Sequence, residues 1–233
     1  MKNILFDLDG TLLPMDEDVF TRQYFGYLCE KMTPLGFEPK RLINTIWKGT
    51  EAMYRNDGSC SNEDAFWKCY QDEYNEPKEK NHQDFVDFYA NEFNKAITST
   101  SPTPLAREII DVCHEKGWNI ILATNPLFPR VGTLNRIRWA GLNEEDFMDI
   151  TTYENSFYCK PNVMYYSEIV ERNGIDPSDS MMVGNDITED LSAGDLGMKT
   201  YLVTDCLLNK GSRTDDADYR GSLSDLLQFL KQL

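Results

Sequence analysis

Two carboxylates one residue apart follow the first apolar segment of the chain. Asp7 and Asp9 come directly after the run at residues 4–6, and Gly10 and Thr11 follow them. A short apolar run of this kind is typical of a buried strand, so the two carboxylates are expected at its carboxyl end. They would repel each other unless a cation lay between them, and hard oxygen ligands favour Mg²⁺ or Ca²⁺. Asp and Gly also suit ordinary turns, so these residues alone leave a metal site and a plain turn equally open.

Further polar residues follow later apolar runs or precede helix candidates. They are Thr124 and Asn125, Lys160, and the group Asn185, Asp186 and Asp190. Ligands gather at the carboxyl ends of parallel strands, so we expect these side chains to meet Asp7 and Asp9 at one edge of a sheet.

Together these residue types suit phosphoryl transfer. One carboxylate can attack phosphorus, and a second carboxylic acid can protonate the leaving oxygen and then activate water. A divalent cation, a hydroxyl and an ammonium can bind the phosphate oxygens.

The second half of the chain alternates between strand and helix candidates. Apolar runs predict strands at 119–123, 148–151, 180–183 and 200–203. Amphipathic patterns predict helices at roughly 103–116, 128–140, 161–173 and 187–196. Alternation at this spacing predicts an α/β fold, a parallel sheet with helices on both faces.

Residues 16–98 have a different pattern, because no strand-like run interrupts them. Apolar and aromatic residues recur at helical spacing over Val19 to Met32, Pro39 to Tyr54, Ser61 to Tyr74 and Asp84 to Ile97. The sequence therefore predicts two units. Residues 1–15 and 99–233 form an α/β core, and 16–98 form a helical cap inserted into it.

Composition excludes several classes of partner. The 233 residues carry a net charge of −16, which disfavours nucleic acid and anionic membranes. No apolar run approaches the roughly 20 residues of a membrane helix, and no signal peptide is evident at the first residues. Six scattered cysteines without a paired motif fit reduced thiols, so we expect a cytoplasmic protein.

The motifs, in this order, resemble those of the haloacid dehalogenase-like (HAD) superfamily of hydrolases. The similarity covers the run from Asp7 to Thr11, then Thr124, Lys160 with Pro161, and Gly184 through Asp190. It implies a Rossmann-like parallel sheet with a helical cap after the first motif. It also implies that Asp7 is the nucleophile and a metal ligand, and that Asp9 is the general acid/base and binds the metal through its backbone carbonyl.

The remaining site residues also follow from the resemblance, which assigns Thr124 and Lys160 to the phosphoryl group. We include Thr11 and Asn125 as further candidates for binding it. The fourth motif departs from the common pattern, because Asn185 stands directly after Gly184 and Asp186 follows. Either Asp186 or Asn185 is the metal ligand; we favour Asp186 because a charged oxygen binds Mg²⁺ more tightly, and Asp190 is a further candidate.

We predict a Mg²⁺-dependent phosphatase that acts on a small phosphorylated metabolite through an aspartyl-phosphate. The alternatives are a phosphomutase with the same two aspartates and, less favoured, a non-catalytic module that binds a phosphorylated ligand. A haloacid dehalogenase has no use for a second acid at Asp9. Neither a nucleic acid nor a membrane is expected as a partner, and the sequence does not indicate the oligomeric state or the substrate.

Overall fold

The computed structural model describes residues 1–209 and 211–233. Within them, six parallel strands form one sheet in the order β3-β2-β1-β4-β5-β6. The strands are β1 (Asn3–Phe6), β2 (Asn119–Leu122), β3 (Asp149–Ile150), β4 (Ser180–Gly184), β5 (Lys199–Val203) and β6 (Tyr219–Gly221). The sheet confirms the predicted α/β class, and its central strand β1 carries Asp7 at its carboxyl end.

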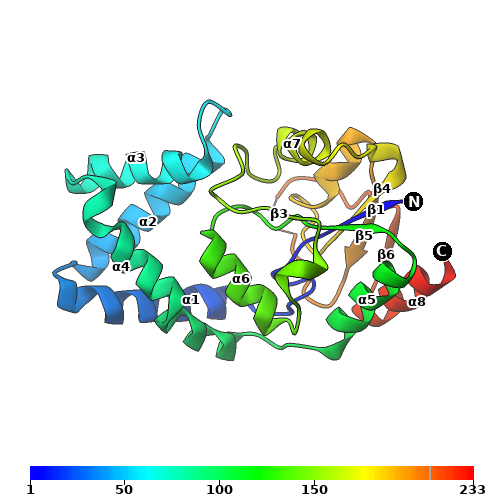
Figure 1. Ribbon diagram of the computed structural model, residues 1–233, viewed down its shortest axis with the longest axis horizontal. Helices are drawn as coiled ribbons and strands as arrows, with labels where there is room; N and C mark the ends of the chain where they lie inside the picture. The colour runs from blue at the N-terminus through cyan, green and yellow to red at the C-terminus, as the bar shows by residue number, and fades with distance from the viewer. Residues whose placement is uncertain (210) are drawn as a thin grey trace.

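Helices cover both faces of the sheet (Figure 1). Successive side chains of β1 point to opposite faces of the sheet, because side chains alternate along a strand. Ile4 and Phe6 pack in the cluster that includes α5 (Pro104–Glu115) and α8 (Leu223–Gln232). Leu5 packs in the cluster that includes α7 (Val163–Asn173). All four residues of β1 are buried, as expected of a strand in the middle of a parallel sheet.

Residues 17–99, between β1 and α5, form helices and no strand, and we call them the cap segment. These are α1 (Glu17–Met32), η1 (Thr33–Leu35), α2 (Pro39–Tyr54), α3 (Asn62–Tyr74), α4 (Lys78–Ala90) and η2 (Glu92–Ser99). Local signals set their starts: Asp16 and Ser61 accept hydrogen bonds from the backbone N–H groups of Val19 and Asp64. Figure 1 shows the cap segment beside the end of the sheet, with α6 (Arg130–Trp139) between them.

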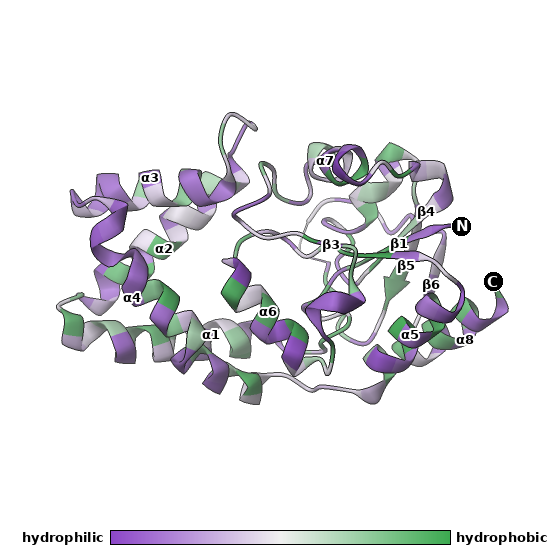
Figure 2. Ribbon diagram, in the orientation of Figure 1, coloured by the Kyte–Doolittle hydropathy of each residue, from purple (hydrophilic) through white to green (hydrophobic). Residues whose placement is uncertain are grey.

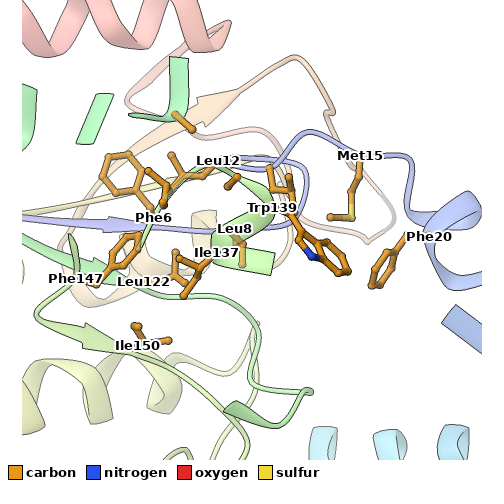
Figure 3. Packing of buried hydrophobic residues seen from close by; sticks show 14 of the residues in the cluster. Phe6, Leu8, Leu12, Met15, Phe20, Leu122, Ile137, Trp139, Phe147 and Ile150 are labelled. Atoms are coloured by element: carbon orange, nitrogen blue, oxygen red, sulfur yellow. The ribbon is translucent and has the colours of Figure 1, made fainter. Parts of the chain in front are cut away.

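Buried apolar side chains continue from the sheet into the cap segment. Figure 3 shows Phe6 and Leu8 near the sheet, and Met15, Phe20 and Trp139 where the chain passes into α1. The first cap helix is therefore anchored to the core by the same apolar cluster that covers one face of the sheet.

Two helical predictions need correction. The helix expected over 187–196 is only a short 3₁₀ helix, η5 (Leu191–Leu196), because the Asp186 carboxylate first accepts the backbone N–H groups of Thr188 and Glu189 and forms a turn. The helix expected over 84–97 ends at Ala90, since Asn91 leaves the helical region with φ −121°, and η2 follows. A short helix, η3 (Glu144–Asp146), precedes β3, and η4 (Pro177–Asp179) precedes β4.

Figure 2 shows hydrophilic and hydrophobic residues interspersed along the helices of the cap segment. Across residues 1–209 and 211–233, no helix combines the length and the apolar character that a membrane span requires.

Candidate active site

Asp7 lies where β1 ends, in a turn that depends on a glycine. Gly10 has φ +81°, and a Cβ there would lie 2.4 Å from Asn185 Nδ2. The turn brings the Thr11 hydroxyl to Asn185 Oδ1 at 2.9 Å and to Asp7 Oδ2 at 3.4 Å. Through these two hydrogen bonds the Thr11 hydroxyl links the first and fourth motifs, and Thr11 is fully buried.

Lys160 lies beneath Asp7, and its side chain is 1% exposed. Its ammonium donates to Asp7 Oδ1 at 3.0 Å and to Asp190 Oδ1 at 2.7 Å. Burial lowers the pKa of Lys160, but the Asp190 and Asp7 carboxylates outweigh burial and hold that pKa well above its ordinary value. Burial raises the pKa of Asp7, against the charge of Lys160 and with the added repulsion of Asp190 and Asp9. The lysine therefore keeps its proton. Its charge does not offset the combined effect of burial and of repulsion from Asp190 and Asp9 on the pKa of Asp7.

Asp9 pairs with a buried arginine from α6. Arg136 Nη1 donates to Asp9 Oδ2, while the Arg136 guanidinium carbon lies 4.2 Å from the centre of the Phe128 ring. Burial raises the pKa of Asp9, and the charge of Arg136 opposes that rise. The other carboxylate oxygen, Oδ1, is buried without a hydrogen-bond partner in the described residues.

The loop after β4 contains three of the predicted residues in different roles. Both ends of the Asn185 amide are used, because Oδ1 accepts from Thr11 and Nδ2 donates to the Cys206 carbonyl at 2.7 Å. Asp190 is buried and holds Lys160 with one oxygen and the Asp186 N–H, at 2.9 Å, with the other. The Asp186 Oδ2 accepts no hydrogen bond from the described residues, so it is the free carboxylate oxygen of this loop.

A contact between the core and the cap segment lies beside the end of β2. Asn125 Nδ2 donates to Glu189 Oε2 at 2.9 Å and to the Tyr54 hydroxyl at 3.2 Å. The Tyr54 hydroxyl in turn donates to Glu189 Oε1 at 3.1 Å. Burial raises the pKa of Glu189 to about 7, so this carboxyl is partly protonated near neutral pH. Thr124, one residue earlier, is buried, and its carbonyl accepts from the Thr151 and Tyr165 hydroxyls.

A cavity of about 490 Å³ joins these groups to the cap segment. Most of the predicted site residues line it: Asp7, Asp9, Thr124, Asn125, Asn185, Asp186 and Asp190. The described lining does not include Thr11 or Lys160. Instead, Thr11 contacts Asn185 and Asp7, and Lys160 forms a buried ion pair with Asp7.

Sequence analysis did not identify Arg136 and Glu189 as site residues. Arg136 lies on a helix that periodicity predicts, but no pattern indicates that this arginine turns inward to Asp9. The sequence pattern indicates that Glu189 is an exposed acid at a helix start, whereas its carboxylate accepts a hydrogen bond from the Tyr54 hydroxyl. The sequence offers only a weak signal, which is that Arg136 lies one helical turn from Gly132 and from Trp139, both of them buried on α6.

The donor set suits a small hard cation. In the described residues no three His, Cys, Asp or Glu side chains form a metal-binding group, so any cation must also use backbone or water oxygens. Mg²⁺ binds in that way, through one or two carboxylates and several waters. Asp7 and Asp186 offer the two carboxylates, because both line the cavity and Asp186 Oδ2 accepts no hydrogen bond from the described residues.

A family model described as haloacid dehalogenase-like hydrolase matches residues 1–195. The chain therefore belongs to the haloacid dehalogenase-like hydrolases, as the motifs predicted. A search of curated protein sequences finds no match.

Solved structures with the same fold have different activities in their names. An HAD phosphatase from Thermococcus onnurineus is 18% identical, with TM-score 0.60 and coverage of 99% of this chain and 98% of that one. A putative β-phosphoglucomutase from Thermotoga maritima is 19% identical, with TM-score 0.61 and full coverage of both chains (100%). A 2-haloacid dehalogenase from Pseudomonas syringae pv. Tomato is 18% identical, with TM-score 0.63 and coverage of 100% and 99%. At these identities the likeness establishes the fold, and the activity has to be argued from the site.

Proposed function

We propose that this hydrolase is a Mg²⁺-dependent phosphatase that cleaves a small phosphate monoester through an aspartyl-phosphate at Asp7. The observation that carries the proposal is that a second carboxyl group, Asp9, lines the same cavity as Asp7. Phosphate ester cleavage needs an acid for the leaving alcohol, whereas halide departs without a proton. The Asp9 carboxyl therefore favours phosphoryl transfer over dehalogenation.

The proposed reaction has two steps. In the first, an Asp7 carboxylate oxygen forms a bond to phosphorus while the bond to the ester oxygen breaks, and Asp9 gives its proton to the departing alcohol. In the second, the Asp9 carboxylate takes a proton from water, which attacks phosphorus and releases Asp7. Burial raises the pKa of Asp9, which helps it hold the proton that the first step needs.

The charges around Asp7 are central to the first step. Lys160 offsets part of the negative charge and is itself fixed by Asp190. We propose that Asp7, the Asp9 backbone carbonyl and the Asp186 carboxylate hold Mg²⁺, with Asn185 fixing the turn. When bound, Mg²⁺ supplies the positive charge that lets an anionic ester approach this acidic site.

We further propose that residues 16–98 act as a cap domain over the core of 1–15 and 99–233. The Tyr54 contact with Glu189 and Asn125 supports closure of the cap segment on the site. All six cysteines are free, which supports a reducing compartment, the cytoplasm.

The direct test is phosphate release from a panel of phosphorylated metabolites, with Mg²⁺ or with a chelator. We expect release with Mg²⁺, loss of release with the chelator, and recovery when Mg²⁺ is restored. The Asp7→Asn protein should release no phosphate under any of these conditions. Turnover by Asp7→Asn, or chloride release from a 2-haloacid in place of phosphate release, would refute the proposal.

A further inference from the structure

The loop between α2 and α3 lies against the core segment that leads to Lys160. Figure 1 shows this loop at the end of the cap segment that faces the core. The core segment, residues 153–159, contains no helix or strand. Gly58 of the loop has φ +87°, and a Cβ there would lie 2.1 Å from the Tyr158 hydroxyl oxygen. The cap loop and the core segment are therefore in direct contact, and the contact requires a glycine.

The first turn of α3 supplies backbone hydrogen bonds across this contact. The first N–H groups of a helix have no partner within it. In α3 the Asn62 N–H donates to the Ser156 carbonyl at 2.8 Å. The Glu63 N–H donates to the Tyr153 carbonyl, also at 2.8 Å. The start of a cap helix and two carbonyls of an irregular core segment thus satisfy each other.

The Asn62 side chain extends the contact to the residue before Lys160. Asn62 is fully buried, and its Nδ2 donates to the Tyr158 carbonyl at 3.3 Å and to the Cys159 sulfur at 3.4 Å. Its Oδ1 accepts from Asn56 Nδ2 at 2.9 Å, which fixes the amide group from the cap side. Cys159 is 3% exposed and directly precedes Lys160. A cap side chain therefore holds the backbone from which Lys160 extends.

The position of Lys160 depends on that backbone. The Lys160 ammonium lies 3.0 Å from Asp7 Oδ1 and 2.7 Å from Asp190 Oδ1, and its side chain is 1% exposed. Because Lys160 is bonded to Cys159, a displacement of Cys159 would change both distances. A displacement of about 1 Å can lower a reaction rate about hundredfold, even when it starts far from the reacting atoms.

We infer that Asn62 is a positioning residue, which holds Cys159 and thereby keeps Lys160 in place beside Asp7. Lys160 is then correctly placed only while the first turn of α3 is docked on the core, so docking of the cap segment and the charge beside the nucleophile are coupled. This inference rests on the proposed phosphatase activity, in which the Lys160 charge offsets part of the charge of Asp7.

Turnover by Asn62→Ala and by the matched variant Asn81→Ala tests the positioning role. Asn81 is also a cap asparagine, 5% exposed, and its Nδ2 donates to Glu76 within the cap segment. Urea unfolding should show that both substitutions destabilise the protein. Only Asn62→Ala should lower kcat, about tenfold or more, with KM changed less than about threefold, because Lys160 acts on the reacting group.

A second substitution isolates the two donor contacts of the Asn62 amide. Asn62→Asp keeps an acceptor for Asn56 and removes the donors to the Tyr158 carbonyl and the Cys159 sulfur. It should lower kcat as Asn62→Ala does, and it provides the measurement if Asn62→Ala does not fold.

Thiol labelling measures the contact without turnover. Iodoacetamide modification of the native protein, resolved by peptide, compares Cys159 with Cys113, which is also buried but lies on α5. In Asn62→Ala we expect Cys159 to react about tenfold faster than in wild type, because the loss of two hydrogen bonds favours local opening. The rate for Cys113 should not change, and Asn81→Ala should leave the rate for Cys159 unchanged.

The outcomes separate this inference from the proposed function. If the wild-type protein hydrolyses no ester, the proposed function fails, and the labelling rate of Cys159 alone decides whether Asn62 holds this segment. If it hydrolyses esters and the Asn62→Ala and Asn81→Ala proteins have equal kcat values, the positioning role is refuted and the phosphatase activity stands. An unchanged labelling rate of Cys159 in Asn62→Ala contradicts the inference in either case.

Discussion

The ion pair between Arg136 and Asp9 connects the proposed general acid/base to a buried arginine. The Arg136 side chain is 1% exposed and that of Asp9 is 23% exposed, so the pair is only partly screened by water. Arg136 also donates to the Thr133 hydroxyl and the Gly132 carbonyl of its own helix. The arginine is therefore fixed on α6, and it fixes the orientation of the Asp9 carboxyl in turn.

Replacing Arg136 tests this role. Because the Arg136 charge lowers the pKa of Asp9, Arg136→Met should raise that pKa and move the basic limb of the kcat–pH profile to higher pH. The free energy of unfolding should fall by about 2 kcal/mol, less than for a fully buried pair. Arg138→Met, on the exposed side of the same helix, is the control. Identical pH profiles for the two variants would contradict the role assigned to Arg136.

Two substitutions in the fourth motif test which residue binds the metal. Asp186→Ala should remove Mg²⁺-stimulated phosphate release, because it deletes the carboxylate oxygen of this loop, Oδ2, that accepts no hydrogen bond from residues 1–209 and 211–233. Asn185→Ala should retain stimulation and lose about 1–3 kcal/mol of stability, because Thr11 and the Cys206 carbonyl lose their partners. A Mg²⁺ titration of activity and a urea titration separate the two effects. The opposite ranking in the Mg²⁺ titration would reassign the ligand to Asn185.

Sequence patterns predicted most of the sheet but not the packing of the helices. Strands β1, β2, β4 and β5 follow from continuous apolar runs, because both faces of a parallel sheet are buried. Lys160 and Asp7 were predicted to meet because Asp7 follows a strand and Lys160 precedes a helix at the same edge of the sheet. Arg136 and Tyr54 could not be predicted in the same way, since periodicity gives the face of a helix and not which residue reaches a distant carboxylate.

The ion pair between Arg107 of α5 and Asp146 of η3 is expected to make the stability of the fold depend on pH. Burial raises the pKa of Asp146, but hydrogen bonds from Arg107 and the Asn143 N–H outweigh burial and hold that pKa below its ordinary value. Arg107 Nη1 lies 2.7 Å from Asp146 Oδ2 and joins α5 to η3. A depressed pKa in the folded state contributes stability above the ordinary Asp pKa, and that stability is lost as pH falls through the folded pKa.

Asp146→Asn should therefore lower the free energy of unfolding by about 1 kcal/mol at neutral pH, and the difference from wild type should shrink toward about pH 3. Urea unfolding at neutral pH and at about pH 3 measures this difference in the free energy of unfolding. Asp111→Asn removes the more exposed partner of Arg107 and should have the smaller effect. A difference that stays constant from neutral to acidic pH would exclude the proposed role of this carboxylate.

In the molecule as a whole, the candidate site forms where the cap segment meets the sheet. The strand ends supply Asp7, Asp9 and Asp186, and the cap segment supplies Tyr54 and the other aromatic side chains that line the cavity from that side. The chain carries a net charge of −16, and among the described residues Arg136 pairs with Asp9 and Lys160 pairs with Asp7. The proposed anionic ester would therefore approach an acidic protein, and the proposed cation would add to these two local positive charges. The core half of this site could be predicted from motifs. The cavity could not, because its shape depends on how four cap helices pack.

The most direct test of the central claim is to trap the intermediate on Asp7. A phosphate ester that the protein turns over, labelled with ³²P, is mixed with the protein and Mg²⁺ and quenched in acid within the first turnover. We expect label on the peptide that contains Asp7, lost at alkaline pH as an acyl phosphate requires, and no label on Asp7→Asn. Release of labelled phosphate without labelled protein, and with Asp7→Asn still active, would contradict the account.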